Sequence, residues 1–65
     1  MLVVVNGELK EIEPLSVLGL LELLEIDPRR VAVELNLDIL PKPDYATTVL
    51  QDGDRIEIVQ FVGGG

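Results

Sequence analysis

The sequence contains no cysteine and no histidine among its 65 residues. The absence of cysteine excludes disulfides, thiolate nucleophiles, thiolate metal ligands and any persulfide carried on a side chain. The absence of histidine removes the usual general base near neutral pH and the common zinc and iron ligand sets. Candidates for a nucleophile and a base are so poor that an enzyme with its own active site is the least favoured class.

Aromatic and basic residues are also scarce. Tyr45 and Phe61 are the only aromatic side chains, so Leu, Ile and Val must build the hydrophobic core. Twelve acidic residues against five basic ones give a net charge of −7, which opposes binding to nucleic acid and to anionic membranes. A protein with a basic face is a better partner. We interpret most of the carboxylates as solvated surface, although they could also steer such a partner.

No segment is typical of a secretory signal or of a membrane span. Only residues 2–5 form an apolar run after Met1, and no basic residue precedes them. The longest apolar segment, residues 15–26, is interrupted by two glutamates and is too short to cross a bilayer. A chain of this length has room for one domain with a thin core. We therefore expect a single cytoplasmic domain over residues 1–65.

The first half of the chain predicts a hairpin followed by a helix. Asn6-Gly7 after a β-branched run is typical of a type I′ turn, with a returning strand at residues 8–13. Ser16 is suited to cap a helix that ends at Asp27-Pro28. Its apolar positions follow the i, i+3, i+4, i+7 spacing of one helical face: Val17, Leu20, Leu21 and Leu24. Gly19 costs this helix about 1 kcal/mol relative to alanine, and we expect close packing against the sheet as the reason.

The second half predicts two strands joined by an irregular crossover. Residues 31–36 alternate between apolar and polar or small side chains, as in a strand with one buried face. Two prolines make residues 37–50 irregular, with at most a short strand or helical turn. Asp52-Gly53-Asp54 marks a tight turn before a last strand at residues 55–61. One helix across one face of a mixed sheet, an α+β arrangement, buries these apolar stripes most economically.

The last strand suggests a docking surface beside the carboxyl terminus. If Ile56 and Ile58 face the helix, the alternate residues lie on the opposite, open face. The expected apolar patch near the tail consists of four residues: Leu2, Val4, Val59 and Phe61. Such a patch is a natural docking site, and ordinary packing at the sheet edge explains it equally well.

The chain finishes with three glycines: Gly63, Gly64 and Gly65. Fully extended, they reach at most about 10 Å beyond the folded body. Without Cβ atoms they fit a narrow channel, so a partner could act on the terminal carboxylate. A frayed end or an expression remnant is the alternative interpretation on composition alone.

The order of these motifs resembles the ThiS family, the ubiquitin-like sulfur carriers of thiazole (thiamine) biosynthesis. The resemblance runs from end to end and is carried by these pieces: Asn6-Gly7-Glu8, Val31-Ala32-Val33-Glu34-Leu35-Asn36, Pro41-Lys42, Tyr45, Asp52-Gly53-Asp54, Ile56-Glu57-Ile58-Val59 and Gly63-Gly64-Gly65. Two positions depart from the family pattern. Lys42 stands where arginine is frequent, and Gly19 stands where an acidic or polar residue is frequent.

The resemblance implies a β-grasp fold, with a mixed sheet of four to five strands, one helix across it and a flexible glycine tail at residues 62–65. It also implies that an E1-like adenylyltransferase of the ThiF type adenylates Gly65. Sulfur from a persulfide donor then gives a C-terminal thiocarboxylate, which is passed to a thiazole synthase of the ThiG type. The chain would be a cosubstrate and not an enzyme. It would bind no cofactor itself, since ATP and Mg²⁺ are used by the activating partner.

Two other functions remain open at this point. A carrier like the small subunit of molybdopterin synthase shares the Gly-Gly end, although the short chain and the Asn6-Gly7 hairpin favour the thiazole pathway. A non-conjugating β-grasp interaction domain would have a chemically inert tail. Modification of Gly65 distinguishes both carriers from the interaction domain.

Overall fold

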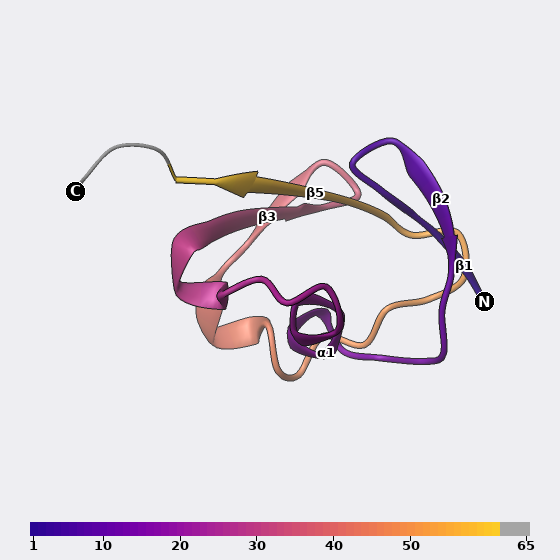
Figure 1. Ribbon diagram of the computed structural model, residues 1–65, viewed down its shortest axis with the longest axis horizontal. Helices are drawn as coiled ribbons and strands as arrows, with labels where there is room; N and C mark the ends of the chain where they lie inside the picture. Colours follow the sequence, from indigo (N-terminus) through magenta and orange to yellow (C-terminus); the bar gives the residue numbers. More distant parts are fainter. Residues whose placement is uncertain (62–65) are drawn as a thin grey trace.

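Strands from both halves of the chain join in one mixed sheet with the order β2-β1-β5-β3-β4 (Figure 1). The computed structural model describes residues 1–61, and in this range the sheet is accompanied by one α-helix. The elements are β1 (Leu2–Val5), β2 (Glu8–Glu11), α1 (Val17–Leu23), the 3-10 turn η1 (Pro28–Arg30), β3 (Val31–Leu35), β4 (Asp38–Leu40), the 3-10 turn η2 (Lys42–Asp44) and β5 (Arg55–Gln60). The flexible tail predicted at residues 62–65 lies outside the described residues.

The first hairpin confirms the predicted turn. Asn6 and Gly7 have φ angles of 49° and 83°, and positive values at both central positions define the type I′ turn. Strand β2 ends at Glu11, two residues before the expected Glu13. Among the strands of residues 1–61, β1 and β5 form the only parallel pair, and the other three strand pairs are antiparallel.

The helix begins where the sequence predicts and ends earlier. The Ser16 hydroxyl accepts a hydrogen bond from the Gly19 amide at 3.0 Å, which confirms the N-cap. Helix α1 ends at Leu23, and Glu25 follows with a left-handed φ of 60°. The prediction that Asp27-Pro28 closes the helix was wrong, because the chain has already left it and these two residues begin η1.

Gly19 is not required by contact with the sheet. A Cβ atom at this position would meet Cδ2 of Leu15 and Oγ of Ser16, both at 3.4 Å. Both neighbours belong to the segment that leads into the helix. The expected reason for this glycine was therefore wrong, and the structure offers no other.

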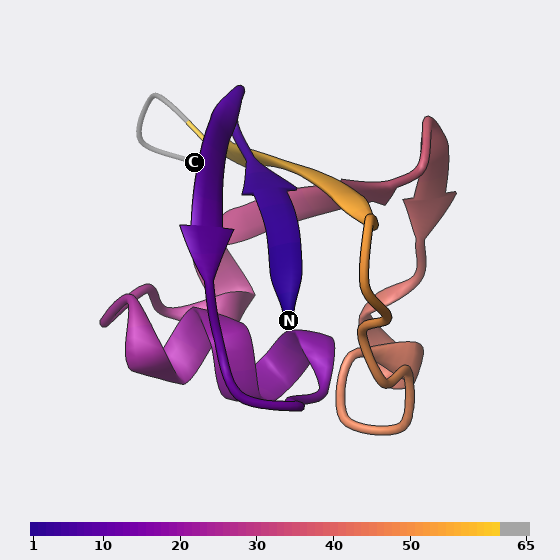
Figure 2. The same ribbon diagram turned by 90° about the vertical axis from the view of Figure 1, so that its right-hand side faces the viewer.

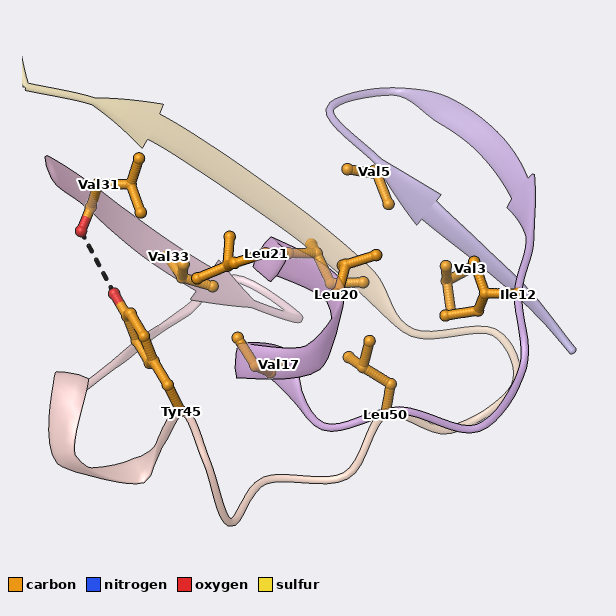
Figure 3. Packing of buried hydrophobic residues seen from close by; sticks show 11 residues of the cluster. Val3, Val5, Ile12, Val17, Leu20, Leu21, Val31, Val33, Tyr45 and Leu50 are labelled. Carbon is orange, nitrogen blue, oxygen red and sulfur yellow. Dashed lines mark hydrogen bonds between the residues drawn. The ribbon is translucent and has the colours of Figure 1, made fainter. Parts of the chain in front are cut away.

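The core lies between the sheet and the helix, which covers one face of the sheet (Figure 2). Figure 3 shows how side chains from α1 meet those of the central strands. The residues buried to at least 98% are Val3, Val17, Leu20, Leu21, Val31, Val33, Leu50 and Ile56. The alternation predicted for residues 31–36 is confirmed, because Val31 and Val33 belong to this set.

The irregular crossover between β3 and β5 is also confirmed. It contains the short strand β4 and the turn η2, as the two prolines allow. Tyr45, directly after η2, is buried, and its hydroxyl donates to the carbonyl of Val31 at 3.4 Å (Figure 3). Burial raises the pKa of the Tyr45 phenol. This aromatic residue thus ties the crossover to the beginning of β3.

Candidate functional site

The described chain ends in a backbone position that is fixed by the neighbouring strand. Strand β5 pairs with β3 up to Gln60, which lies opposite Val31. Beyond the strand, the amide of Phe61 donates to the carbonyl of Arg30 at 2.9 Å. The tail therefore begins next to a residue that is held in register with the sheet. Gly63, Gly64 and Gly65, the predicted tail and modification residues, lie outside the described range.

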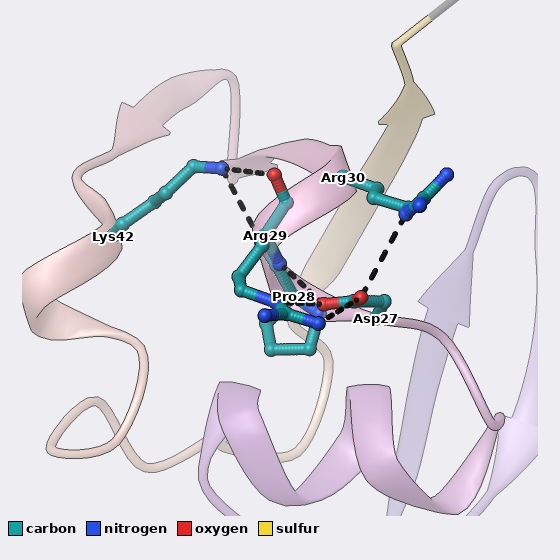
Figure 4. A network of polar contacts seen from close by, with 5 residues as sticks. All are labelled: Asp27, Pro28, Arg29, Arg30 and Lys42. Atoms are coloured by element: carbon teal, nitrogen blue, oxygen red, sulfur yellow. Dashed lines mark hydrogen bonds and ion pairs between the residues drawn. The ribbon is translucent and has the colours of Figure 1, made fainter.

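Two 3-10 turns lie next to Phe61. The ammonium group of Lys42, in η2, donates to the carbonyl of Arg29 at 3.0 Å and to that of Pro28 at 3.4 Å (Figure 4). The same ammonium lies 5.1 Å from the centre of the Phe61 ring, within the range of a cation–π contact. Lys42 thus connects η1, η2 and the start of the tail.

Asp27 organises the two arginines of η1. Its Oδ1 accepts hydrogen bonds from the Arg29 amide at 2.9 Å and from Arg29 Nε at 3.1 Å, and its Oδ2 accepts from Nη2 at 2.9 Å. Nε of Arg30 lies 3.8 Å from Oδ2 (Figure 4). The bonds from Arg29 lower the pKa of Asp27 to about 2, and the same contact raises the pKa of Arg29. The carboxylate is therefore charged at neutral pH and holds η1 in shape.

The predicted docking residues do not form one patch. Ile56 is fully buried, while Val59 and Phe61 are 57% and 59% exposed, so the predicted open face exists. Leu2 and Val4 belong to the same face, but Val4 pairs with Arg55, at the beginning of β5. Val59 is four residues further along, a distance of about 13 Å.

The expectation that β1 lies near the tail was therefore wrong. Strand β1 runs parallel to β5 and ends at Val5, opposite Ile56, before the Asn6-Gly7 turn. At the tail end, Val59 instead pairs with Ala32 of β3. The docking role of the four residues stays a prediction.

Sequence reasoning missed the basic residues of the two turns next to Phe61. Arg29, Arg30 and Lys42 are three of the five basic residues in the chain. They are brought together only because the crossover returns beside η1 after β4. The one signal in the sequence was the uneven distribution of the basic residues, because three of the five lie in two short segments.

Residues 1–61 enclose no pocket and contain no group of three or more acidic side chains arranged to hold a metal ion. The single α-helix in this range is also too short to cross a membrane. The cytoplasmic location stays a prediction.

A mixed sheet that wraps one helix and leads its central strand toward a glycine tail defines the class of ubiquitin-like β-grasp domains. The profile of the ThiS family matches residues 3–65, and the chain belongs to this family. The crystal structure of a thiamine biosynthesis protein (ThiS) from Geobacter metallireducens has the same fold, with a TM-score of 0.86 and 36% identity over the full length of both chains. This confirms the resemblance and the fold predicted from the sequence.

Two further relatives are informative. The sulfur carrier protein ThiS of Bacillus subtilis is 42% identical over 50 residues, which cover 77% of this chain and 76% of that protein. A thiazole synthase of Paramagnetospirillum magneticum is 48% identical over 66 residues and matches this chain from end to end. This chain spans only 20% of the length of that thiazole synthase.

Proposed function

We propose that this chain is a sulfur carrier of thiamine biosynthesis and that the carboxylate of Gly65 is the group that receives the sulfur. Membership of the ThiS family carries the proposal, because the family match extends through the three terminal glycines. The name of the Bacillus subtilis relative, a sulfur carrier protein, supports the carrier role, and that of the Geobacter metallireducens relative, a thiamine biosynthesis protein, supports the pathway. The carrier is a cosubstrate, and the catalytic groups belong to its partners.

The proposed cycle begins with activation of Gly65. A carboxylate is a poor electrophile, so an E1-like ThiF-type enzyme joins it to the α-phosphate of Mg-ATP and releases pyrophosphate. The resulting acyl-adenylate has a good leaving group. A persulfide donor then attacks the carbonyl carbon, AMP leaves, and cleavage of the sulfur–sulfur bond by a thiol gives the thiocarboxylate. With no cysteine in the chain, the terminal carbonyl is the only covalent attachment point for sulfur.

A thiazole synthase of the ThiG type is the proposed acceptor of this sulfur. Support comes from two relatives named thiazole synthase, in which the matching segment is about a fifth of a longer polypeptide. Fusion of two segments is a natural arrangement for partners that act in succession. We assign docking on the activating enzyme to the exposed side chains Val59 and Phe61, which lie beside the start of the tail.

Intact-mass spectrometry tests the proposal. The protein is incubated with Mg-ATP, a ThiF-type enzyme and a sulfur donor, and we expect the mass change of one oxygen replaced by sulfur at Gly65. A variant lacking Gly65 should remain unmodified while its circular dichroism spectrum is unchanged. The Bacillus subtilis ThiS protein serves as the competent control. If the control reacts and this chain does not, the carrier function is refuted.

A binding experiment distinguishes the two pathways. Under the proposal, the modified protein binds a thiazole synthase and transfers its sulfur there. Preferential binding to the large subunit of a molybdopterin synthase would instead assign the chain to the alternative carrier class.

A further inference from the structure

The end of β5 from which the tail continues lies beside η1 and η2, and these two turns carry three of the five basic residues of this acidic protein. We name Arg29, Arg30, Lys42 and the ring of Phe61 the basic collar. The side chains of Arg29 and Arg30 are 86% and 77% exposed. The Phe61 ring is exposed as well. The collar is therefore accessible to another molecule.

The positive charge of the collar is only partly neutralised. Among the described residues, the ion pairs of these three cations involve one carboxylate, that of Asp27. The Lys42 ammonium is bonded to carbonyl oxygens and lies over an aromatic ring, and neither carries a negative charge. Asp44 is the only other acidic residue within η1 and η2. The collar thus keeps a net positive charge.

The opposite end of β5 is acidic. Asp52 and Asp54 precede the strand, and Glu11 and Asp38 lie at the same end through their pairing partners. These four carboxylates outnumber the positive charges there, which are Arg55 and the N-terminal ammonium paired with Glu11. Six residues of extended strand separate Arg55 from Phe61, a distance of about 20 Å. This is about twice the Debye length near physiological ionic strength. A charged group of a partner that contacts the collar therefore interacts only weakly with the carboxylates at the acidic end.

We propose that the basic collar is an interaction surface for carboxylates on the rim of the pocket in which the activating adenylyltransferase receives the tail. This inference rests on the proposed carrier function. Four residues follow Phe61, and fully extended they span at most about 14 Å. The collar consequently meets the rim of the pocket, while Gly65 reaches the reacting atoms.

An acidic protein surface fits the collar better than a nucleic acid. A nucleic acid presents a long array of phosphates, which would continue past the collar onto the acidic remainder of the protein. A short ring of carboxylates contacts the collar alone. These carboxylates attract the collar and repel the acidic end of β5, and the two forces together orient the carrier so that the tail enters the pocket first.

Association kinetics with the purified ThiF-type adenylyltransferase test this inference. Arg30→Glu reverses one collar charge, and Lys10→Glu makes the same change on β2, outside the collar. We expect Arg30→Glu to slow association about tenfold at low ionic strength. The association rate of Lys10→Glu should stay within about twofold of that of the parent protein. The difference should vanish at high ionic strength.

A second substitution separates a docking effect from a folding effect. Arg30→Gln removes the charge without placing a new carboxylate beside Asp27. It should also slow association, by a smaller factor than Arg30→Glu. Circular dichroism of each variant checks the fold. Equal rates for Arg30→Glu and Lys10→Glu, or a loss that does not depend on salt, would overturn the inference.

Mass measurements on the same samples distinguish a failure of this inference from a failure of the proposed function. If the parent protein does not bind the adenylyltransferase, the collar is refuted as a docking surface for that enzyme. If it binds with the expected charge dependence and its mass never changes in the presence of Mg-ATP and a sulfur donor, the carrier function fails and the collar stands.

Discussion

Asn6 and Ile58 are joined by two hydrogen bonds although they are 52 residues apart in sequence. The Ile58 amide donates to Oδ1 of Asn6 at 2.7 Å, and Nδ2 of Asn6 donates to the Ile58 carbonyl at 3.3 Å. The side-chain amide therefore continues the parallel pairing of β1 with β5 after β1 has entered its turn. One asparagine provides both the left-handed turn position and a link to the strand that leads to the tail.

We expect Asn6→Gly to lower the free energy of unfolding by about 1 kcal/mol. Glycine accepts the positive φ of the turn, so the loss reports the two side-chain hydrogen bonds. Asn6→Ala should cost about 1 kcal/mol more, because alanine is strained in the left-handed region. Urea denaturation measures both values. An Asn6→Gly protein as stable as the parent would show that the amide bonds contribute nothing.

We expect the side chains of Lys42 and Phe61 to be energetically coupled. A double-mutant cycle with Lys42→Met and Phe61→Leu should give a coupling free energy of about 0.5–1 kcal/mol. Val59→Ala combined with Lys42→Met is the matched control and should be additive within about 0.5 kcal/mol. Equal coupling in both cycles would contradict a specific contact between the ammonium and the ring.

Gly19→Ala is expected to stabilise the protein by up to about 1 kcal/mol, because alanine has the higher helix propensity. The added methyl group would lie in ordinary contact with Leu15 and Ser16. Thermal and urea unfolding measure the gain. Destabilisation would mean that the segment before the helix cannot accommodate the methyl group, and that glycine is required by the N-cap.

The ion pair of Asp27 predicts a change of stability at acid pH. Its pKa is lowered from 3.8 to about 2 in the folded protein, so the unfolded chain takes up the proton more readily. The stabilisation is therefore present above pH 3.8 and is lost as the pH falls toward 2. Asp27→Asn should have a lower melting temperature than the parent at neutral pH, and the difference should shrink over this window.

A matched substitution checks the cause of that pH dependence. Arg29→Gln removes the main donor to the Asp27 carboxylate and leaves the carboxylate in place. The melting temperature of this variant should depend less on pH below 3.8 than that of the parent protein. If the two proteins respond alike, Arg29 is not the group that lowers the pKa of Asp27.

Local features of the fold could be predicted from the sequence because neighbouring residues determine them. The left-handed pair Asn6-Gly7, the Ser16 cap and the alternation of residues 31–36 each depend on backbone preferences within a few positions. The end of α1 was missed because a single left-handed residue, Glu25, ends the helix before the proline signal. Glutamate at that position gave no indication of this.

Relations between distant segments could not be obtained in this way. The sequence suggested that Leu2 and Val4 accompany Phe61, whereas the parallel register places them at the beginning of β5. The collar was missed for the same reason, since Arg29 and Lys42 meet only through the path of the crossover. Neither register nor path is encoded in the spacing of apolar residues.

The family, the first hairpin, the start of the helix, the strand at residues 31–35 and the absence of cysteine could all be read from the amino-acid sequence. These depend on residue identity and on backbone preferences of short range. The packing of the folded chain, in contrast, brings η1 and η2 together beside Phe61 and places Leu2 and Val4 at the other end of β5. Strand register and crossover path result from burying all the apolar faces at once, and that requirement is satisfied by the whole chain together.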